Sequence, residues 1–136
     1  MSLLYKSGYK YQLAHEHTTA TRIHGWSARV PGYVYLWPDG HLWIGPGYAW
    51  DGPSGPTLDT PSFMQASLVH DVLYQLIREG YLPSTLRELA DTELRRYCLE
   101  NGMSRLRAWY TWRAVRVFGQ RALAQREILS APTALV

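Results

Sequence analysis

Three side chains near the middle of the sequence have the types and the spacing needed for acid–base chemistry. His70 and Tyr74 are four residues apart and share one face of a helix, whereas Asp71 is turned about 100° away from His70. A neutral imidazole is a good base near neutral pH, and a carboxylate is a hard oxygen ligand that suits calcium. The segment therefore offers a base and a candidate cation ligand side by side.

Asp91 is the expected partner of His70. It follows His70 by twenty-one residues (91 − 70), and a short turn over 80–83 would join two antiparallel helices and bring the two side chains level. Leu94 and Tyr97 on the following turns are apolar or aromatic, so a carboxylate at Asp91 needs a polar partner. We expect that partner to be the second ring nitrogen of His70.

A loop rich in glycine and proline precedes these residues. Residues 45–56 hold too many glycines and prolines for a regular helix or strand. Calcium takes six to eight oxygen ligands, and glycine lets backbone carbonyls converge where side chains would clash. The run Asp51-Gly52-Pro53-Ser54-Gly55 suits that role, so we expect this loop to supply oxygen ligands to a Ca²⁺ ion beside Asp71.

The elements that must position this site change character once along the chain. Up to about residue 50, aromatic and β-branched residues alternate with polar ones, as in 9–13 and 33–37, which predicts strands. Pro38-Asp39-Gly40 predicts a hairpin turn between strands 33–37 and 41–44, because Asp and Gly tolerate the positive φ that tight hairpins need. The first third is therefore predicted to be a small antiparallel sheet.

From residue 62 onward the apolar residues recur at a helical period. We predict helices over 62–79, 84–100 and 104–122, with stops at Gly80 and at Asn101-Gly102. The expected fold is a single α+β domain over residues 1–130, with β-hairpins over 1–50, the loop over 51–61, and three helices over 62–122 whose first two form the antiparallel pair that carries the site. Residues 131–136 are predicted to be a flexible tail.

The run His70-Asp71-Val72-Leu73-Tyr74, with the glycine loop before it and Asp91 after it, resembles the catalytic signature of the phospholipase A₂ superfamily. The resemblance covers about residues 50–98. It implies calcium-dependent hydrolysis of a phospholipid acyl ester. In that chemistry His70 is the base, Asp71 and the Asp51-Gly52 loop bind calcium, Asp91 orients His70, and Tyr74 braces the network. Secreted members flank the pair with cysteines and carry a signal peptide, whereas this chain has Leu68, Val69, Val72 and Leu73 there and we expect no leader.

A second resemblance covers most of the chain. The stretch Gly47-Tyr48-Ala49-Trp50-Asp51-Gly52-Pro53-Ser54-Gly55-Pro56-Thr57, followed by Phe63-Met64, Ser67 to Asp71 and Leu73-Tyr74, is similar to the hallmark of a family of small proteins encoded by tailed phages and prophages. It implies a phage or prophage origin and no particular activity. The alternative to an enzyme is thus a virion, assembly or host-interaction protein in which His70, Asp71 and Asp91 form a structural network that pins the loop to the helices.

Another class of metal enzyme also uses a His-Asp pair. Some phosphohydrolases hold metals with a histidine, the pair and a later aspartate, and the extra ligand here would be His15, His17, His24 or His41. Their fold is all-helical and larger, so the β-rich first half argues against them. His15 and His17 would share a face of a strand and could bind zinc, or simply lie exposed there.

The third predicted helix interleaves aromatic rings and cations. We expect Leu106, Trp109 and Val117 to pack inward and the arginines to face outward, with at least one of Trp109 and Trp112 in the core. A candidate interface formed by Arg105, Trp109, Trp112, Arg113 and Arg116 suits a phospholipid or membrane surface or a phage structural protein, with nucleic acid less favoured.

Composition and hydropathy limit the compartments in which we expect this protein. Cys98 is the single cysteine, so an internal disulfide is impossible and a reducing compartment is tolerated. The sequence shows no basic-then-apolar leader and no eighteen-residue apolar run. We therefore expect no signal peptide and no transmembrane segment. With these expectations, the resemblance to the phage family implies a location in the host bacterial cytoplasm or in a phage virion.

Overall fold

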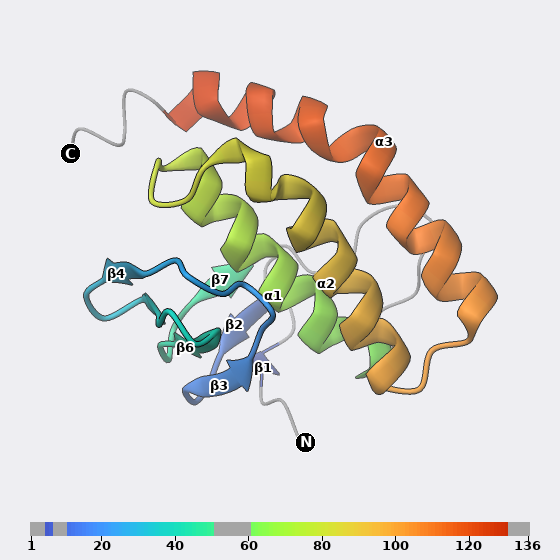
Figure 1. Ribbon diagram of the computed structural model, residues 1–136. Helices are drawn as coiled ribbons and strands as arrows, with labels where there is room; N and C mark the ends of the chain where they lie inside the picture. The colour runs from blue at the N-terminus through green and yellow to red at the C-terminus, as the bar shows by residue number, and fades with distance from the viewer. Residues whose placement is uncertain (1–4, 7–10, 51–60, 131–136) are drawn as a thin grey trace.

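The computed structural model of the 136-residue chain describes residues 5–6, 11–50 and 61–130. An antiparallel β region precedes three helices, which confirms the predicted α+β class (Figure 1). The strands are β1 (Tyr5–Lys6), β2 (Tyr11–Leu13), β3 (His17–Ala20), β4 (Ala28–Val30), β5 (Val34–Leu36), β6 (His41–Ile44) and β7 (Ala49–Trp50). The helices are α1 (Pro61–Arg78), α2 (Arg87–Glu100) and α3 (Arg105–Ser130), with a short 3-10 turn, η1 (Ser84–Leu86), before α2.

The strands form two antiparallel sheets, one in the order β3-β6-β5-β4 and a smaller one in the order β1-β2-β7. The predicted hairpin is present, because β5 pairs with β6 through Val34↔Ile44 and Leu36↔Leu42. Its turn needs glycine at position 40: φ there is 97°, and a Cβ would collide with the carbonyl oxygen of Thr21. The turn residues thus fix the register of the hairpin.

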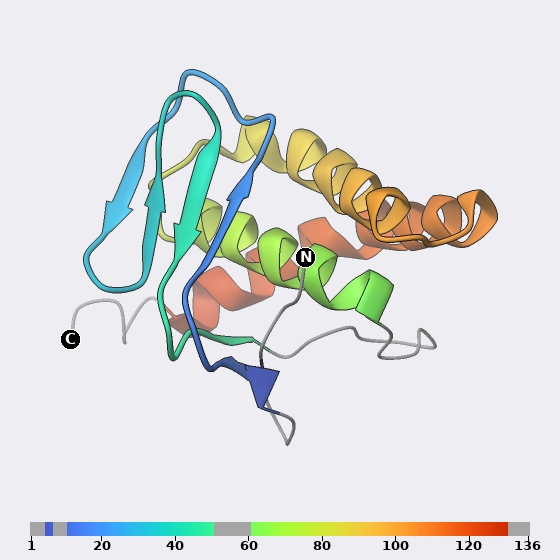
Figure 2. The ribbon, with the colours of Figure 1, turned by 90° about the horizontal axis from the view of Figure 1, so that it is seen from below.

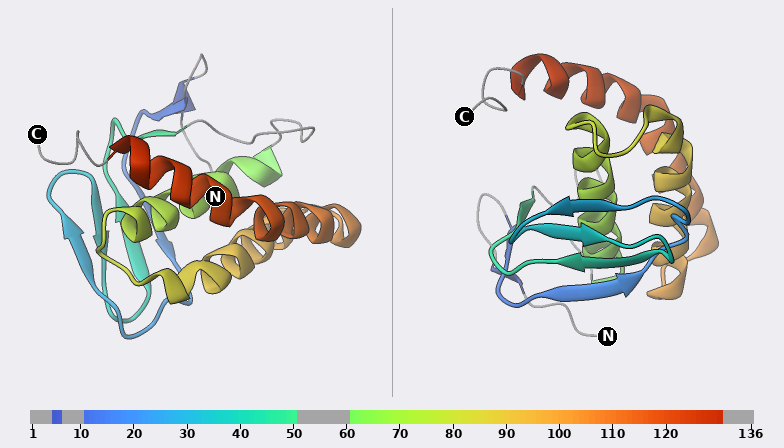
Figure 3. Two further views of the ribbon diagram at one scale, coloured as in Figure 1. Left: turned by 90° about the horizontal axis from the view of Figure 1, so that it is seen from above. Right: turned by 60° about the vertical axis from the view of Figure 1, so that its left-hand side comes forward.

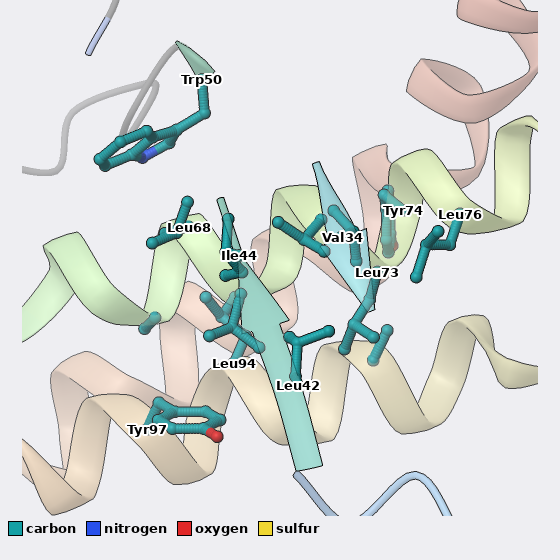
Figure 4. Close-up of a cluster of buried hydrophobic side chains, with 14 of the residues drawn as sticks. Val34, Leu42, Ile44, Trp50, Leu68, Leu73, Tyr74, Leu76, Leu94 and Tyr97 are labelled. Carbon is teal, nitrogen blue, oxygen red and sulfur yellow. The ribbon is translucent and has the colours of Figure 1, made fainter. Parts of the chain in front are cut away.

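Alternate residues of the larger sheet face the helices. Val34, Leu36, Leu42 and Ile44 are buried. Figure 4 shows Val34, Leu42 and Ile44 in one cluster with Leu68 and Leu73 of α1. On the outer face, the cross-strand partners Tyr35 and Trp43 stack with ring centroids 5.1 Å apart. The sheet therefore alternates buried aliphatic and outward aromatic residues.

The helices form two further layers on the sheet. Figures 1 and 2 show α1 and α2 side by side next to the sheet, and Figure 3 shows α3 crossing the surface of this pair that faces away from the strands. Since α1 lies between the sheet and α3, its residues are buried on nearly every side. The middle of α1, where His70 lies, is thus inside the molecule.

A buried ion pair ties α2 to the strand layer. Glu93 accepts hydrogen bonds from Nε and Nη2 of Arg96, at 2.7 and 2.9 Å, and from the backbone N–H of Arg22. Arg96 also donates to the carbonyl of Ala20 and to Glu100. The charge of the buried Glu93 is satisfied by these bonds, and the same bonds hold the end of β3 to α2.

The first two helices begin and end within three residues of the prediction, with η1 occupying the first turn predicted for the second helix. The third continues to Ser130, eight residues beyond its predicted end. Residues 120–130 contain no glycine or proline, so nothing in the sequence stops the helix there. The predicted tail over 131–136 lies outside the described residues.

The prediction of which residues of α3 pack inward was wrong. Leu106, Trp109 and Val117 are exposed, and the helix packs instead through Ala108, Thr111 and Gly119, with Val115 half-buried. These small side chains let α3 approach the α1–α2 pair closely, which bulkier residues at those positions would prevent.

Candidate functional site

The fully buried carboxylate of Asp91 is the centre of a four-residue cluster. His70 Nε2 lies 2.7 Å from Asp91 Oδ1, and the hydroxyl of Tyr74 donates to the same oxygen at 2.6 Å. Arg116 Nη1 donates to Oδ2 at 2.9 Å. The sequence predicted the contact of Asp91 with His70, and the phospholipase A₂ resemblance implied that Tyr74 braces this network. Neither indicated the contact with Arg116.

The turn between α1 and α2 sets this alignment. Gly80, at φ 82°, ends α1, and the N–H groups of Tyr81 and Leu82 donate to the carbonyl of Leu76. Leu82 is buried and fixes the connection against the core. With the turn closed in this way, α2 runs back along α1, and the twenty-one-residue separation places Asp91 opposite His70.

The cluster holds Asp91 ionised. Burial alone would raise the pKa of Asp91, but hydrogen bonds from His70, Tyr74 and Arg116 lower it below its ordinary value. Burial and the Asp91 carboxylate raise the pKa of Tyr74, so the phenol stays protonated and donates. An anionic Asp91 favours the His70 tautomer with its proton on Nε2, which leaves the lone pair on Nδ1.

His70 is the member of the cluster best placed to act on another molecule. It is mostly buried, with 8% of its surface exposed, and its ring lies 4.1 Å from that of Tyr74, centroid to centroid. Nδ1 has no hydrogen-bond partner in the part of the chain that the structure describes. The nitrogen that carries the lone pair is thus the one that Asp91 does not hold.

The third helix closes the cluster, a role that the sequence analysis did not assign to it. Besides Arg116, it contributes Gly119, where an added Cβ would collide with the hydroxyl of Tyr74. Arg87 of α2 donates from Nη2 to the carbonyl of Arg116 at 2.7 Å. A glycine within a helix that otherwise lacks one was the available sequence signal for this close approach.

Of the three predicted calcium ligands, the structure describes only Asp71. Asp71 is half-buried beside His70, while Asp51 and Gly52 lie outside the described residues. Trp50, the last described residue before that loop, is buried, and its indole N–H donates to Ser67 Oγ at 3.1 Å, three residues from His70 on α1. The chain thus enters the loop from a point fixed on α1.

Among the residues that the structure describes, no three His, Cys, Asp or Glu side chains form a metal site. The predicted sharing of a strand face by His15 and His17 was wrong: His15 precedes β3 and is exposed, while His17 is buried with Nε2 3.0 Å from Gln65 Nε2. His41 is exposed and bonds Asp39, and His24 is also exposed. No histidine of the first half therefore joins His70.

The predicted interface residues divide into two groups. Arg105, Trp109 and Arg113 are exposed on α3. Arg116 turns inward to Asp91, and Trp112 is half-buried beneath the guanidinium of Arg95, 5.5 Å from the ring centroid. The expectation that all the arginines face outward was therefore wrong at Arg116.

A pocket of about 240 Å³ lies on the side of α1 that faces the sheet. It is lined by Val30, Tyr33, Val34, Tyr48, Val72, Gln75, Leu76 and Glu79 and includes no member of the Asp91 cluster. Since none of its lining residues belongs to the cluster, this largely apolar hollow is separate from the acid–base site.

Comparison of the chain with protein-family models, with curated proteins and with solved structures gives no match. Over the described residues, none of the helices has the length and apolar character needed to cross a bilayer.

Proposed function

We propose that this chain is a phospholipase A₂-like hydrolase that cleaves a lipid acyl ester in a calcium-dependent reaction, with His70 as general base. The observation that carries the proposal is the 2.7 Å contact between His70 Nε2 and the fully buried, ionised Asp91. An orienting carboxylate on one ring nitrogen makes the other nitrogen an effective base. The sequence resemblance of residues 50–98 supports the same assignment.

The chain's own residues account for the proton transfers. Nδ1 of His70 takes a proton from a water molecule as the water oxygen attacks the ester carbonyl carbon. When the tetrahedral intermediate collapses, the bond from carbon to the alcohol oxygen breaks and His70 returns its proton to that oxygen. The products are an alcohol and a carboxylic acid, which releases its remaining proton to solvent and becomes a carboxylate. Asp91 and Tyr74 hold the imidazole in place throughout.

The donor set suits calcium, because Asp71, Asp51 and the carbonyl of Gly52 all offer oxygen. Calcium bound there would supply positive charge for the oxyanion that forms at the ester carbonyl. Calorimetry tests the site directly: the parent should bind Ca²⁺ saturably and Asp71→Asn should not. Asp39→Asn, which removes an exposed carboxylate of the β5–β6 turn, is the matched control and should bind like the parent.

Hydrolysis tests the base. The parent should release fatty acid from phospholipid in calcium and not in a chelator, and His70→Asn should lose at least about a hundredfold in rate. His24→Asn removes an exposed histidine elsewhere and should leave the rate unchanged. Equal hydrolysis by parent and by a folded His70→Asn variant would refute the proposal.

One observation favours a second candidate function. Asp91 is fully buried and both carboxylate oxygens are bonded, which is also what a purely structural network requires. In this alternative the chain is a phage virion, assembly or host-interaction protein, and His70 and Asp91 serve folding alone. A folded parent that binds no calcium and releases no fatty acid, together with copurification with assembled particles, would establish it over the hydrolase.

A further inference from the structure

The third helix presents an apolar and aromatic stripe to solvent. Leu106, Trp109, Tyr110 and Val117 have exposed fractions of 74%, 45%, 43% and 58%. With Arg113, which is also exposed, they recur at intervals of three and four residues and span an arc of about 100° on a helical projection. We call these five residues the α3 stripe.

The α3 stripe is not needed to hold the helix in place. Ala108, Thr111 and Gly119 pack on the opposite side of the helix, and Arg116, at its edge, bonds Asp91. Large apolar side chains that gather on one exposed face, away from the contacts of the fold, are typical of a binding surface.

The charge of this region is of one sign. Arg105 and Arg113 are exposed on the helix, and the sequence from 101 to 126 contains neither aspartate nor glutamate. Arginine forms paired hydrogen bonds with phosphate, and the rings of Trp and Tyr favour the level of lipid head groups, where an apolar body meets water. The partner should therefore be anionic, with an apolar layer directly beneath its charged groups.

We propose that the α3 stripe docks this protein on the surface of an anionic phospholipid bilayer. The helix lies in the plane of the interface, with Leu106, Trp109 and Val117 entering the head-group region and Arg105 and Arg113 meeting lipid phosphates. Such a surface is also where the ester substrate of the proposed hydrolase is found. The inference itself rests on the stripe and not on the chemistry of His70.

Two other partners fit the stripe less well. A second copy of the chain docked stripe to stripe would bring Arg113 and Arg105 against the same cations, with no carboxylate between residues 101 and 126 to offset them. Nucleic acid would satisfy the arginines but offers no apolar layer for Leu106 and Val117. Charge and apolar surface together favour the bilayer.

Vesicle sedimentation tests the proposal with the full chain. The parent should bind vesicles of phosphatidylcholine with about one third phosphatidylglycerol, bind pure phosphatidylcholine far more weakly, and be released by salt. Trp109→Ser should lower the partition coefficient about tenfold or more, and Arg113→Gln about fivefold. Both positions are exposed, and circular dichroism checks that each variant is folded.

The matched controls carry the same substitutions on the sheet side. Trp37, with an exposed fraction of 46%, is as accessible as Trp109, and Arg29 on β4 is exposed like Arg113. Trp37→Ser and Arg29→Gln should bind vesicles within about twofold of the parent. The inference would be overturned if the control variants lost as much vesicle binding as the α3 variants. It would also be overturned if the parent did not bind anionic vesicles at low salt.

Two further outcomes would assign the stripe to another partner and overturn the bilayer. One is a parent that is dimeric by light scattering and becomes monomeric in Trp109→Ser. The other is a parent that binds DNA more tightly than anionic vesicles and loses that binding in Arg113→Gln. Vesicle binding is measured without hydrolysis, so an inactive His70 would leave this test unaffected.

Discussion

Arg116 on α3 donates from Nη1 to Oδ2 of Asp91 on α2, across 2.9 Å. The other carboxylate oxygen already accepts from His70 and Tyr74 on α1, so all three helices meet at one buried carboxylate. The cluster is therefore a tertiary feature as much as a candidate site, and its stability and its chemistry can be tested separately.

Removing the cation of this pair should be costly. Arg116→Met keeps the aliphatic packing but leaves Oδ2 of the fully buried Asp91 without a partner, and we expect a loss of about 2–4 kcal/mol in the free energy of unfolding. Urea denaturation measures it. Arg113→Met on the exposed face of the same helix should change stability by less than about 0.5 kcal/mol, and a similar loss in both variants would contradict the prediction.

Because Gly119 lies so close to Tyr74, we expect substitutions at these two positions to have non-additive effects on stability. Gly119→Ala would normally stabilise a helix, but its methyl group collides with the hydroxyl of Tyr74, so we expect a net loss of about 1–3 kcal/mol. In the Tyr74→Phe background the hydroxyl is absent and the same substitution should cost less. A double-mutant cycle by denaturation would show this difference, and strictly additive effects would argue against the contact.

Buried His17 should make stability depend on pH. Burial lowers the pKa of His17 below its ordinary value, so the unfolded chain takes up a proton at a higher pH than the folded one. This contribution is fully present above about pH 6.5 and is lost as the pH falls toward the folded-state pKa. We expect urea unfolding between about pH 7 and pH 5 to show a falling stability that His17→Gln flattens.

The control for this pH effect is an exposed histidine. His15→Gln should leave the slope of the unfolding free energy against pH as it is in the parent. Asp91, whose pKa is lowered, contributes its own loss only at more acidic pH, because the unfolded carboxyl titrates near pH 4. A slope between about pH 7 and pH 5 that survives His17→Gln would show that another group causes it.

Glu93 and Glu100 both bond Arg96, but they should contribute differently to the free energy of unfolding. Glu93 is buried, with 1% of its side chain exposed, whereas Glu100 is 54% exposed. Glu93→Gln leaves the guanidinium without its buried counter-charge and should lower the unfolding free energy by about 2–3 kcal/mol, against about 0.5 kcal/mol for Glu100→Gln. Thermal and urea denaturation of both variants would compare them, and equal losses would refute the ranking.

Local spacing was enough to bring together three of the four residues of the Asp91 cluster. Four residues separate His70 from Tyr74, and a short turn fixes the register of Asp91, so helix geometry alone brings these three side chains together. The hairpin of β5 and β6 followed in the same way from its turn residues. Arg116 depends on how α3 crosses the other two helices, which no local pattern specifies.

The inner face of α3 was predicted wrongly because hydrophobicity alone was used to choose between two faces of the helix. Leu106, Trp109 and Val117 are the more apolar set, yet Ala108 and Gly119 pack, since close crossing of helices needs small side chains. His17 was missed for a related reason. Its partner Gln65 comes from α1, and that partner in turn accepts from Asn101 at 2.8 Å, so the polar residue is buried by contacts distant in sequence.

Cys98 is fully buried in α2, and burial raises the pKa of its thiol to about 12. Only the thiolate reacts with alkylating reagents at an appreciable rate, so this native sulfur is shielded while the fold is intact. A cysteine introduced on the exposed surface would then be the one that takes up a fluorophore or spin label. Because the native cysteine does not react in the folded protein, a label can be attached at one chosen surface position. Each face of the molecule can then be monitored separately.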